Sequence, residues 1–167
     1  MKKLFATLFV MAAVMVVVPN TAKAIEDPFR NGTLLLGAQA GIYPGIGGTL
    51  YGDYVVVDSW WKGHFTVGAQ AGFRYWNYGG EYHYIYNDLA ITPRATYGLR
   101  ITNIFEVHAG VVAGLGVRFY DAHSQLGFCY GPIAGIRLFL SESVAFSAEF
   151  NYSNFGTWAN AGLAFKF

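Results

Sequence analysis

Few residues in this 167-residue sequence are of types that commonly catalyse reactions or bind metals. Cys129 is the only cysteine, so neither an intramolecular disulfide nor a cluster of thiolate ligands can form within the chain. His64 and His108 could form a metal site or an acid–base pair, but their separation does not match the short spacing of a zinc-ligand motif. We therefore favour plain hydrogen bonding for both histidines, and the sequence predicts neither a metal site nor a cofactor.

Charged residues are the second group that could do chemistry, and they make up only 13 % of the chain. Typical globular domains contain about 25 %. Ten of the charges recur within apolar stretches: Asp53, Arg74, Asp88, Arg94, Arg100, Glu106, Arg118, Arg137, Glu149 and Lys166. Such charges can form a paired network or line a path for ions, and the elements that carry them decide between the two.

The apolar stretches have a period of two residues, which is typical of β-strands. From His64 to Tyr75 every second residue is apolar, beginning at Phe65, and the intervening residues are polar or glycine. The stretch from Phe105 to Tyr120 repeats this pattern and is long enough to cross a bilayer, because a tilted strand needs about 9–11 residues. The same test predicts eight strands, near residues 33–43, 48–57, 64–76, 87–100, 105–120, 127–140, 143–153 and 157–167.

The beginning of the chain has the features of a secretory signal peptide. Two lysines after Met1 precede an apolar run from Leu4 to Val18, and Ala22-Lys23-Ala24 follows as a small-residue cleavage pattern. The run is shorter than the roughly 20 residues that a spanning helix needs. We therefore expect residues 1–24 to be removed and residues 25–167 to form one domain.

The composition of residues 25–167 excludes nucleic acid as a partner and favours an apolar solvent. These residues carry 11 − 3 = 8 basic against 10 acidic side chains, so the basic surface of a nucleic-acid-binding protein is absent. Hydrophobic residues reach 54 % and aromatic residues 18 % of the whole chain. A secreted chain of this composition suits an apolar solvent better than water.

One face of every predicted strand is free of charge. The ten charges above all lie on the opposite face, and the other eight lie in the predicted tail, turns or loops: Glu26, Asp27, Arg30, Asp58, Lys62, Glu81, Asp121 and Glu142. A basic residue on a lipid-facing strand position at mid-bilayer costs about 2–4 kcal/mol. Unpaired backbone in lipid is costlier still, so the strands must close. The sequence predicts an all-β fold, a closed antiparallel up-and-down transmembrane barrel of about eight strands.

Aromatic residues gather where the strands should meet the two membrane surfaces. One group comprises Trp60, Trp61, Phe105, Phe165 and Phe167, and the other comprises Tyr43, Tyr75, Tyr84, Tyr120, Tyr130 and Tyr152. They predict two aromatic girdles, the alternative being the core of a soluble sandwich. Short turns are predicted at 58–63, 101–104 and 141–142, and longer loops at 77–86 and 121–126. Pro93 and Pro132 cannot donate to a ladder, so we expect bulges there.

Three segments make the chain similar to the small OmpA/OmpX-like outer-membrane β-barrels of Gram-negative bacteria. They are Ile91-Thr92-Pro93-Arg94-Ala95-Thr96-Tyr97, Val107-His108-Ala109-Gly110-Val111, and Asn160-Ala161-Gly162-Leu163-Ala164-Phe165-Lys166-Phe167. The resemblance covers residues 25–167 and implies the outer membrane as location and outer-membrane lipid as surroundings. It also implies that Leu163, Phe165 and Phe167 form the signal read by the barrel-assembly machinery.

The resemblance raises an enzymatic alternative, because barrels of this size include enzymes that deacylate or acylate lipid A. The deacylases carry a His-x-Ser-Asn motif, which Asn151-Tyr152-Ser153-Asn154 resembles. Asn151 stands where the motif has histidine, so Ser153 has no general base. We therefore expect no catalysis.

A pore and a binding protein are the remaining alternatives. The lumen of an eight-stranded barrel is just wide enough for side chains to fill it, which favours a paired charge network over a conduit. We expect Arg94 to pair with Glu149 across the lumen and Glu106 with Arg137 on the adjacent strand. Inward glycines would leave room for a narrow pore. The tyrosine-rich loop 77–86 could bind a surface ligand, although a girdle with a polar tip explains the same residues. A structural or surface-binding role is the prediction.

Overall fold

The structure, a computed structural model, describes residues 29–43, 45–61, 63–78, 84–120 and 123–167. The predicted signal peptide lies outside the described residues, as do Glu26, Asp27, Lys62, Glu81 and Asp121. The strands are β1 (Leu34–Tyr43), β2 (Ile46–Trp60), β3 (Gly63–Tyr78), β4 (Tyr84–Arg100), β5 (Phe105–Tyr120), β6 (His123–Phe139), β7 (Val144–Ser153) and β8 (Gly156–Lys166). In the described part of the chain, no helix is long and apolar enough to cross a membrane.

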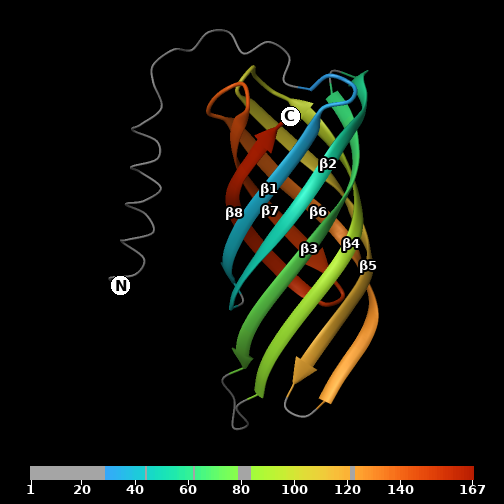
Figure 1. Cartoon of the computed structure of the whole chain (residues 1–167), viewed down its shortest axis with the longest axis vertical. Coiled ribbons are helices and arrows are strands. Elements are labelled where there is room, and N and C mark those ends of the chain that lie inside the picture. The colour runs from blue at the N-terminus through green and yellow to red at the C-terminus, as the bar shows by residue number, and fades with distance from the viewer. Residues whose placement is uncertain (1–28, 44, 62, 79–83, 121–122) are drawn as a thin grey trace, which may run out of the picture.

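The strands form a closed barrel, in which every strand pairs antiparallel with its neighbours in sequence and β8 pairs with β1 (Figure 1). This confirms the predicted fold class and strand number. Closure is completed at the end of β8, where two hydrogen bonds join Phe167 to Leu34. The Phe167 amide donates to the Leu34 carbonyl at 2.8 Å, and the Leu34 amide donates to the Phe167 carbonyl at 3.0 Å. Every strand therefore has a partner on both sides within the closed part of the barrel, as a bilayer requires.

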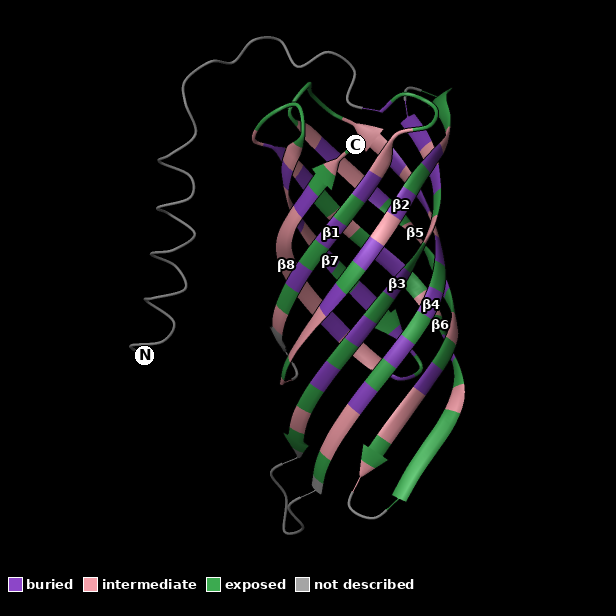
Figure 2. Cartoon of the chain, in the orientation of Figure 1, coloured by how far each residue is buried: buried purple, intermediate pink, exposed green. Residues whose placement is uncertain are grey.

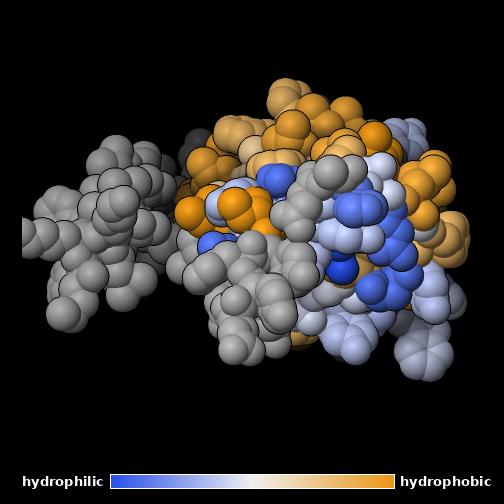
Figure 3. Space-filling view, turned by 90° about the horizontal axis from the view of Figure 1, so that it is seen from below, coloured by the Kyte–Doolittle hydropathy of each residue, from blue (hydrophilic) through white to orange (hydrophobic). Residues whose placement is uncertain are grey.

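Burial alternates along most of the strands as the period of two predicts (Figure 2). In β5, Val111 and Leu115 are each 59 % exposed on the outer surface, whereas Glu106 is fully buried in the lumen. Seen from one end, hydrophobic residues occupy much of the flanks, and hydrophilic residues gather on the end face (Figure 3). The barrel is thus apolar outside and polar inside.

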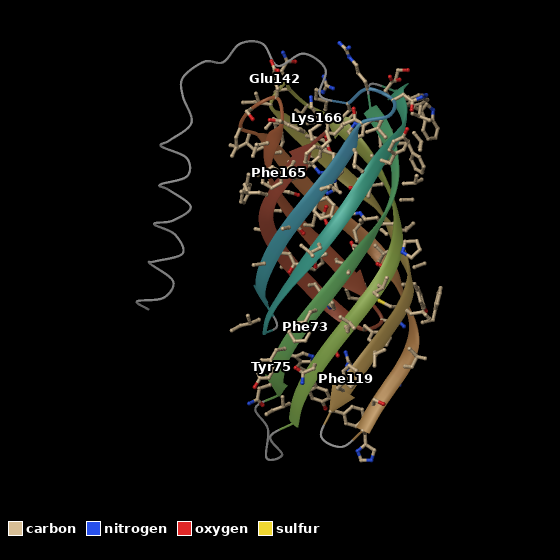
Figure 4. The ribbon with its side chains drawn as sticks, viewed as in Figure 1. Phe73, Tyr75, Phe119, Glu142, Phe165 and Lys166 are labelled. Carbon is tan, nitrogen blue, oxygen red and sulfur yellow. The ribbon has the colours of Figure 1, made fainter. Side chains whose placement is uncertain are left out.

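The two ends of the barrel differ. We call the end with the chain terminus Phe167 and the turns at 101–104 and 140–143 the inner end, and the opposite end the outer end. Phe165, Lys166 and Glu142 lie at the inner end, whereas Phe73, Tyr75 and Phe119 lie toward the outer end (Figure 4). The exposed aromatic side chains therefore include members at both levels, where girdles are predicted.

Strands β3 to β6 reach beyond the other four at the outer end (Figure 1). The β3–β4 ladder extends to Tyr78↔Tyr84 and the β5–β6 ladder to Tyr120↔His123. By contrast, β2 stops pairing with β3 at Ile46, and β7 stops at Ser153. We call residues 76–78, 84–88, 117–120 and 123–128 the outer projection.

The outer projection corrects the predicted loops at 77–86 and 121–126, because residues 77–78, 84–86 and 123–126 belong to β3, β4 and β6. The apolar alternation that guided the sequence prediction ends at the membrane surface, but cross-strand contacts between polar and aromatic side chains carry the ladders further. The first and last outer connections are short, since β1 ends at Tyr43 and β2 begins at Ile46, and β7 ends at Ser153 and β8 begins at Gly156.

Two further predictions about strands are wrong. The turn predicted at 58–63 is narrower, because β2 continues to Trp60 through register shifts after Val55 and Val57, so that Asp58 lies within the strand. Neither proline causes a bulge. The β4–β5 ladder skips Pro93 and resumes in the same register, and Pro132 lies one position beyond the last β6–β7 pair, where no β7 partner needs its missing N–H.

Replacing Val111 by arginine should destabilise the barrel, because this outward side chain lies near the middle of the apolar belt. We expect Val111→Arg to lower the free energy of unfolding by about 2–4 kcal/mol. The matched control is Ser124→Arg, which also adds an outward arginine but in the outer projection, where the cost should be about 0–1 kcal/mol. Urea titration in phospholipid vesicles measures both, and equal costs would contradict this placement of the membrane.

Candidate functional site

The lumen contains a group of buried charges between mid-barrel and the inner end, which we call the central network: Asp53, Arg94, Glu106, His108, Arg137 and Glu149. Arg137 lies at its centre and is fully buried. Its Nη1 donates to Glu106 Oε1 at 2.9 Å, and its Nη2 donates to Asp53 Oδ2 at 2.8 Å. Since Glu106 and Arg137 are direct partners in the β5–β6 register, the strand pairing itself brings them together.

Arg94 joins opposite walls of the lumen. From β4 it donates to Glu149 on β7 through Nη2 at 2.8 Å and through Nη1 at 3.1 Å, and its Nε lies 2.9 Å from Asp53 Oδ1. A two-pronged contact between guanidinium and carboxylate is among the strongest charge-assisted hydrogen bonds. The two pairs expected from the sequence, Arg94–Glu149 and Glu106–Arg137, thus belong to one network, which the sequence did not indicate.

The two histidines contact the carboxylates of this network. His108 Nε2 lies 3.0 Å from Glu149 Oε1, and His64 Nε2 lies 3.7 Å from Glu106 Oε2. The His64 ring also stacks on Phe29 with a centroid distance of 3.7 Å, which covers the inner end of the lumen. Among the described residues, no group of three His, Cys, Asp or Glu side chains is arranged to hold a metal ion.

Tyr51 fills the space beside the two arginines. The guanidinium of Arg94 lies 4.5 Å from the centre of its ring and that of Arg137 lies 5.8 Å away. The Tyr51 hydroxyl donates to Ser147 Oγ at 3.1 Å. An aromatic ring, two guanidinium groups and their carboxylates therefore occupy the lumen at this level.

A second charged group, the outer charged row, lies at the outer end and comprises Arg74, Asp88 and Arg118. These residues are register partners on β3, β4 and β5. Arg118 donates to Asp88 through Nε at 2.7 Å and through Nη2 at 3.0 Å, and Arg74 Nη2 donates to Asp88 Oδ2 at 3.1 Å. The sequence predicted that all three point inward but did not predict that one carboxylate joins both arginines.

Two aromatic residues that the sequence analysis missed fill the lumen next to this row, on the side toward mid-barrel. Trp158 on β8 reaches across to Gly72 on β3, where a Cβ would overlap its indole ring, and the Arg74 guanidinium lies 4.9 Å from the ring. Phe155, in the turn before β8, packs on Gly116, where a Cβ would lie 3.0 Å from its ring. The inward parity of position 158 was the available signal for Trp158.

The remaining predicted lumen charges lie near the inner end. Arg100 is half-buried, and its guanidinium lies 6.0 Å from the centre of the Phe29 ring. Lys166 is also half-buried and follows Phe165 in β8 (Figure 4). Within the described strands, the charged residues thus lie in the lumen or, like exposed Asp58, close to the inner end, where its carboxylate accepts from the Asn31 amide.

The segment that resembles a deacylase motif closes a turn. The Ser153 hydroxyl donates to the Gly156 carbonyl at 3.1 Å and accepts from the Phe155 amide at 3.3 Å. Asn154 hydrogen-bonds the backbone of β6, donating to the Phe128 carbonyl at 2.7 Å. Both side chains therefore shape the connection between β7 and β8.

The three residues at the end of the chain predicted as an assembly signal lie on β8 or directly after it. Leu163 is half-buried, whereas Phe165 and Phe167 are 41 % and 72 % exposed. Both phenylalanines have the same parity as Leu163, opposite to that of the buried Ala164. They point away from the lumen.

Comparisons with known proteins agree with this architecture. No protein-family model and no curated protein matches the sequence. Among solved structures, a de novo designed transmembrane β-barrel has a TM-score of 0.55 at 13 % identity, covering 83 % of this chain and 98 % of that one. Neisserial surface protein A has a TM-score of 0.54 at 16 % identity, covering 81 % and 94 %. Ail of Yersinia pestis, solved with the heparin analogue sucrose octasulfate, has a TM-score of 0.50 at 14 % identity, covering 81 % and 97 %.

The fold and the distribution of side chains define the class of protein. A closed barrel of eight antiparallel strands with an apolar outer surface and a charged lumen is a small transmembrane β-barrel of the outer-membrane type. The bacterial outer membrane is the location that this architecture fits.

The central network should be sensitive to the loss of one member. Arg137→Met leaves Glu106 and Asp53 buried without their main counter-charge, so we expect the free energy of unfolding to fall by about 3–5 kcal/mol. The double variant with Arg137→Met and Glu106→Gln should regain part of the lost free energy of unfolding, because one of the two unpaired carboxylates is neutralised. Lys166→Met, at the half-buried inner end, is the control and should cost less than about 1 kcal/mol. Urea titration in vesicles measures all three. A double variant that is less stable than Arg137→Met alone would contradict the pairing of Glu106 with Arg137.

Proposed function

We propose that the protein is a non-enzymatic integral outer-membrane barrel with a structural or surface-binding role and a lumen closed by its own side chains. The observation that carries the proposal is the filling of the lumen at two separate levels. The central network and Tyr51 fill the lumen between mid-barrel and the inner end, and Trp158 with Phe155 fills it next to the outer charged row, on the side toward mid-barrel. Each level joins strands from different walls of the barrel.

The inward glycines support the closed lumen. A glycine on the inner face leaves room either for water or for a large neighbouring side chain. Here a Cβ on Gly72 would meet Trp158, one on Gly37 would meet Tyr51, and one on Gly98 would meet His64. Because the rings occupy these spaces, the glycines favour packing over a narrow pore, the alternative that their number had suggested.

The environment of Ser153 supports the absence of catalysis. A serine nucleophile needs a general base within hydrogen-bond distance. Its hydroxyl donates to the Gly156 carbonyl and accepts from the Phe155 amide, and position 151 holds an asparagine. An amide cannot accept the proton as imidazole does, so this constellation lacks the base of a deacylase.

Three partners follow from the proposal. Outer-membrane lipid would contact the apolar outer surface, and the barrel-assembly machinery would read Leu163, Phe165 and Phe167, two of which are outward and exposed. A surface ligand would contact the outer end, where the loop 77–86 was the first candidate and the outer projection now extends it. The binding of a sulfated sugar by Ail, to which the fold is similar, is compatible with a surface-binding role for such a barrel.

Electrical recordings test the closed lumen. We expect the wild-type protein in planar lipid bilayers to give at most small and infrequent conductance steps, because two levels of side chains cross the lumen. Trp158→Ala removes the larger ring of the outer level and should stay closed, since the central network is intact. Different mobility of boiled and unboiled samples on a gel confirms that each variant is folded. Steady open currents from the wild-type protein would overturn the proposal.

Mass spectrometry of lipid A tests the absence of catalysis. We expect lipid A from Gram-negative cells that produce the protein to be unchanged, because Ser153 lacks a base. Ser153→Ala serves as the matched control and should give the same spectrum. Loss or gain of an acyl chain in the wild-type sample alone would show that the protein is an enzyme.

A further inference from the structure

The inner face of the outer projection carries one aromatic ring on each of its four strands. Trp76 on β3 pairs with Tyr86 on β4, Tyr86 pairs with Tyr120 on β5, and Tyr120 pairs with His123 on β6. Trp76 and Tyr86 are stacked at 4.3 Å, Tyr86 and Tyr120 lie 6.0 Å apart, and Tyr120 and His123 are stacked at 5.7 Å. We call these four residues the aromatic row.

The outer charged row lies next to the aromatic row, on the side toward mid-barrel. Each of its members is two residues from an aromatic neighbour on the same strand, so both rows face the barrel axis. Arg118 lies 5.5 Å from the centre of the Trp76 ring and 5.8 Å from that of Tyr86. The cationic guanidinium of Arg118 therefore lies beside the rings of Trp76 and Tyr86.

Among the described residues of this layer, positive charge exceeds negative charge. Arg74 and Arg118 share the single carboxylate of Asp88, which also accepts from Trp76 Nε1 at 3.1 Å. The hydrogen bonds of Arg118 to described residues come from Nε and Nη2, so Nη1 is left to contact a ligand. Its side chain is 24 % exposed, whereas that of Arg74 is 4 % exposed.

The aromatic row is accessible from one side. Strands β7, β8, β1 and β2 end nearer the inner end than the aromatic row, so none of the described strands faces the row across the barrel axis (Figure 1). Residues 123–126 of β6 are exposed on both faces (Figure 2). Trp76, Tyr86 and Tyr120 are half-exposed and His123 is exposed. The projection thus forms a shallow wall that presents rings above a cation.

We propose that this wall binds an acidic glycan. The C–H faces of sugar rings pack on flat aromatic side chains, and a row of four rings offers this contact to several sugars of one chain. A sulfate, phosphate or carboxylate on the glycan would take the Nη1 edge of Arg118, because the guanidinium fork matches such groups. The inference rests on the proposed surface-binding function and names its ligand class.

The glycan arrives from the aqueous side of the membrane. The rings lie on the concave face and point toward the barrel axis, whereas the convex face presents Phe119 and Leu126 instead. A sugar chain in solution can reach the concave face directly through the open side above β7, β8, β1 and β2. Lipopolysaccharide of the surrounding leaflet is the competing occupant.

Calorimetry with the whole folded protein in lipopolysaccharide-free phosphatidylcholine nanodiscs tests the proposal. The probes are maltohexaose and sulfated maltohexaose, which have the same sugar chain and differ only in charge. We expect the sulfated probe to bind and the neutral probe to bind at least tenfold more weakly. Raising the salt concentration should weaken binding of the sulfated probe. Equal binding of both probes, or binding of neither, would overturn the proposal.

Variants assign the binding to the wall. Tyr120→Ala removes a ring from the row and should weaken binding of the sulfated probe about fivefold, the effect expected for one aromatic contact. Phe119→Ala removes a ring of the same strand from the opposite face and should leave binding unchanged. Arg118→Lys keeps the charge but loses the fork, and Arg118→Gln should remove the preference for the sulfated probe. Equal losses in Tyr120→Ala and Phe119→Ala would overturn the assignment to the concave face.

A further measurement distinguishes the two sources. Lipopolysaccharide that co-purifies with the wild-type protein but not with Tyr120→Ala or Arg118→Gln would identify the membrane lipid as occupant and overturn the aqueous source. Failure of the sugar probes leaves the closed lumen untouched, because conductance and lipid A analysis test that proposal independently. Gel mobility with and without boiling shows that each variant retains its barrel.

Discussion

Burial of Arg137 between two carboxylates is the interaction on which the lumen depends. Its guanidinium is fully buried and contacts Glu106 and Asp53, which are fully buried as well. Charges in such a position persist only with partners, because each unpaired one costs several kcal/mol. Since Arg137 lies on β6 and its two partners lie on β2 and β5, the contacts favour one strand register: a slip by one residue would turn a charge toward lipid.

The lumen is filled because small residues on one strand face large side chains of another. Where β3 has Gly72, the space is taken by Trp158 of β8, and where β1 has Gly37, it is taken by Tyr51 of β2. A larger residue at either glycine would clash with a ring that is itself held in place, Trp158 by the Arg74 guanidinium and Tyr51 by Ser147. The same glycines that suggest an open channel in the sequence are therefore what permits its closure.

Sequence reasoning was accurate where the membrane constrains each residue and failed where it does not. Between Phe105 and Leu115 a single misplaced charge is costly, so the period of two predicts strand, facing and fold class together. At Tyr86 or His123, beyond the lipid, polar and apolar residues are both tolerated, and only cross-strand pairing shows that these positions are strand. The pairs Arg94–Glu149 and Glu106–Arg137 were deduced from depth along the strands. Phe155 was missed, because a turn residue has no periodicity that would reveal its direction.

The outer projection leaves β6 with an exposed edge. The hydrogen bonding along this edge indicates whether the projection lies in lipid or in water. Beyond Ile133 the strand has lost β7, and Asn154 takes over: its Oδ1 accepts from the Tyr130 amide at 2.9 Å and its Nδ2 donates to the Phe128 carbonyl. No β7 residue pairs with positions 123–126, which are exposed on both faces. An open edge is too costly in lipid but acceptable in water. The projection, with its rings and its exposed arginine, therefore stands in the aqueous phase, where a water-soluble ligand can reach it.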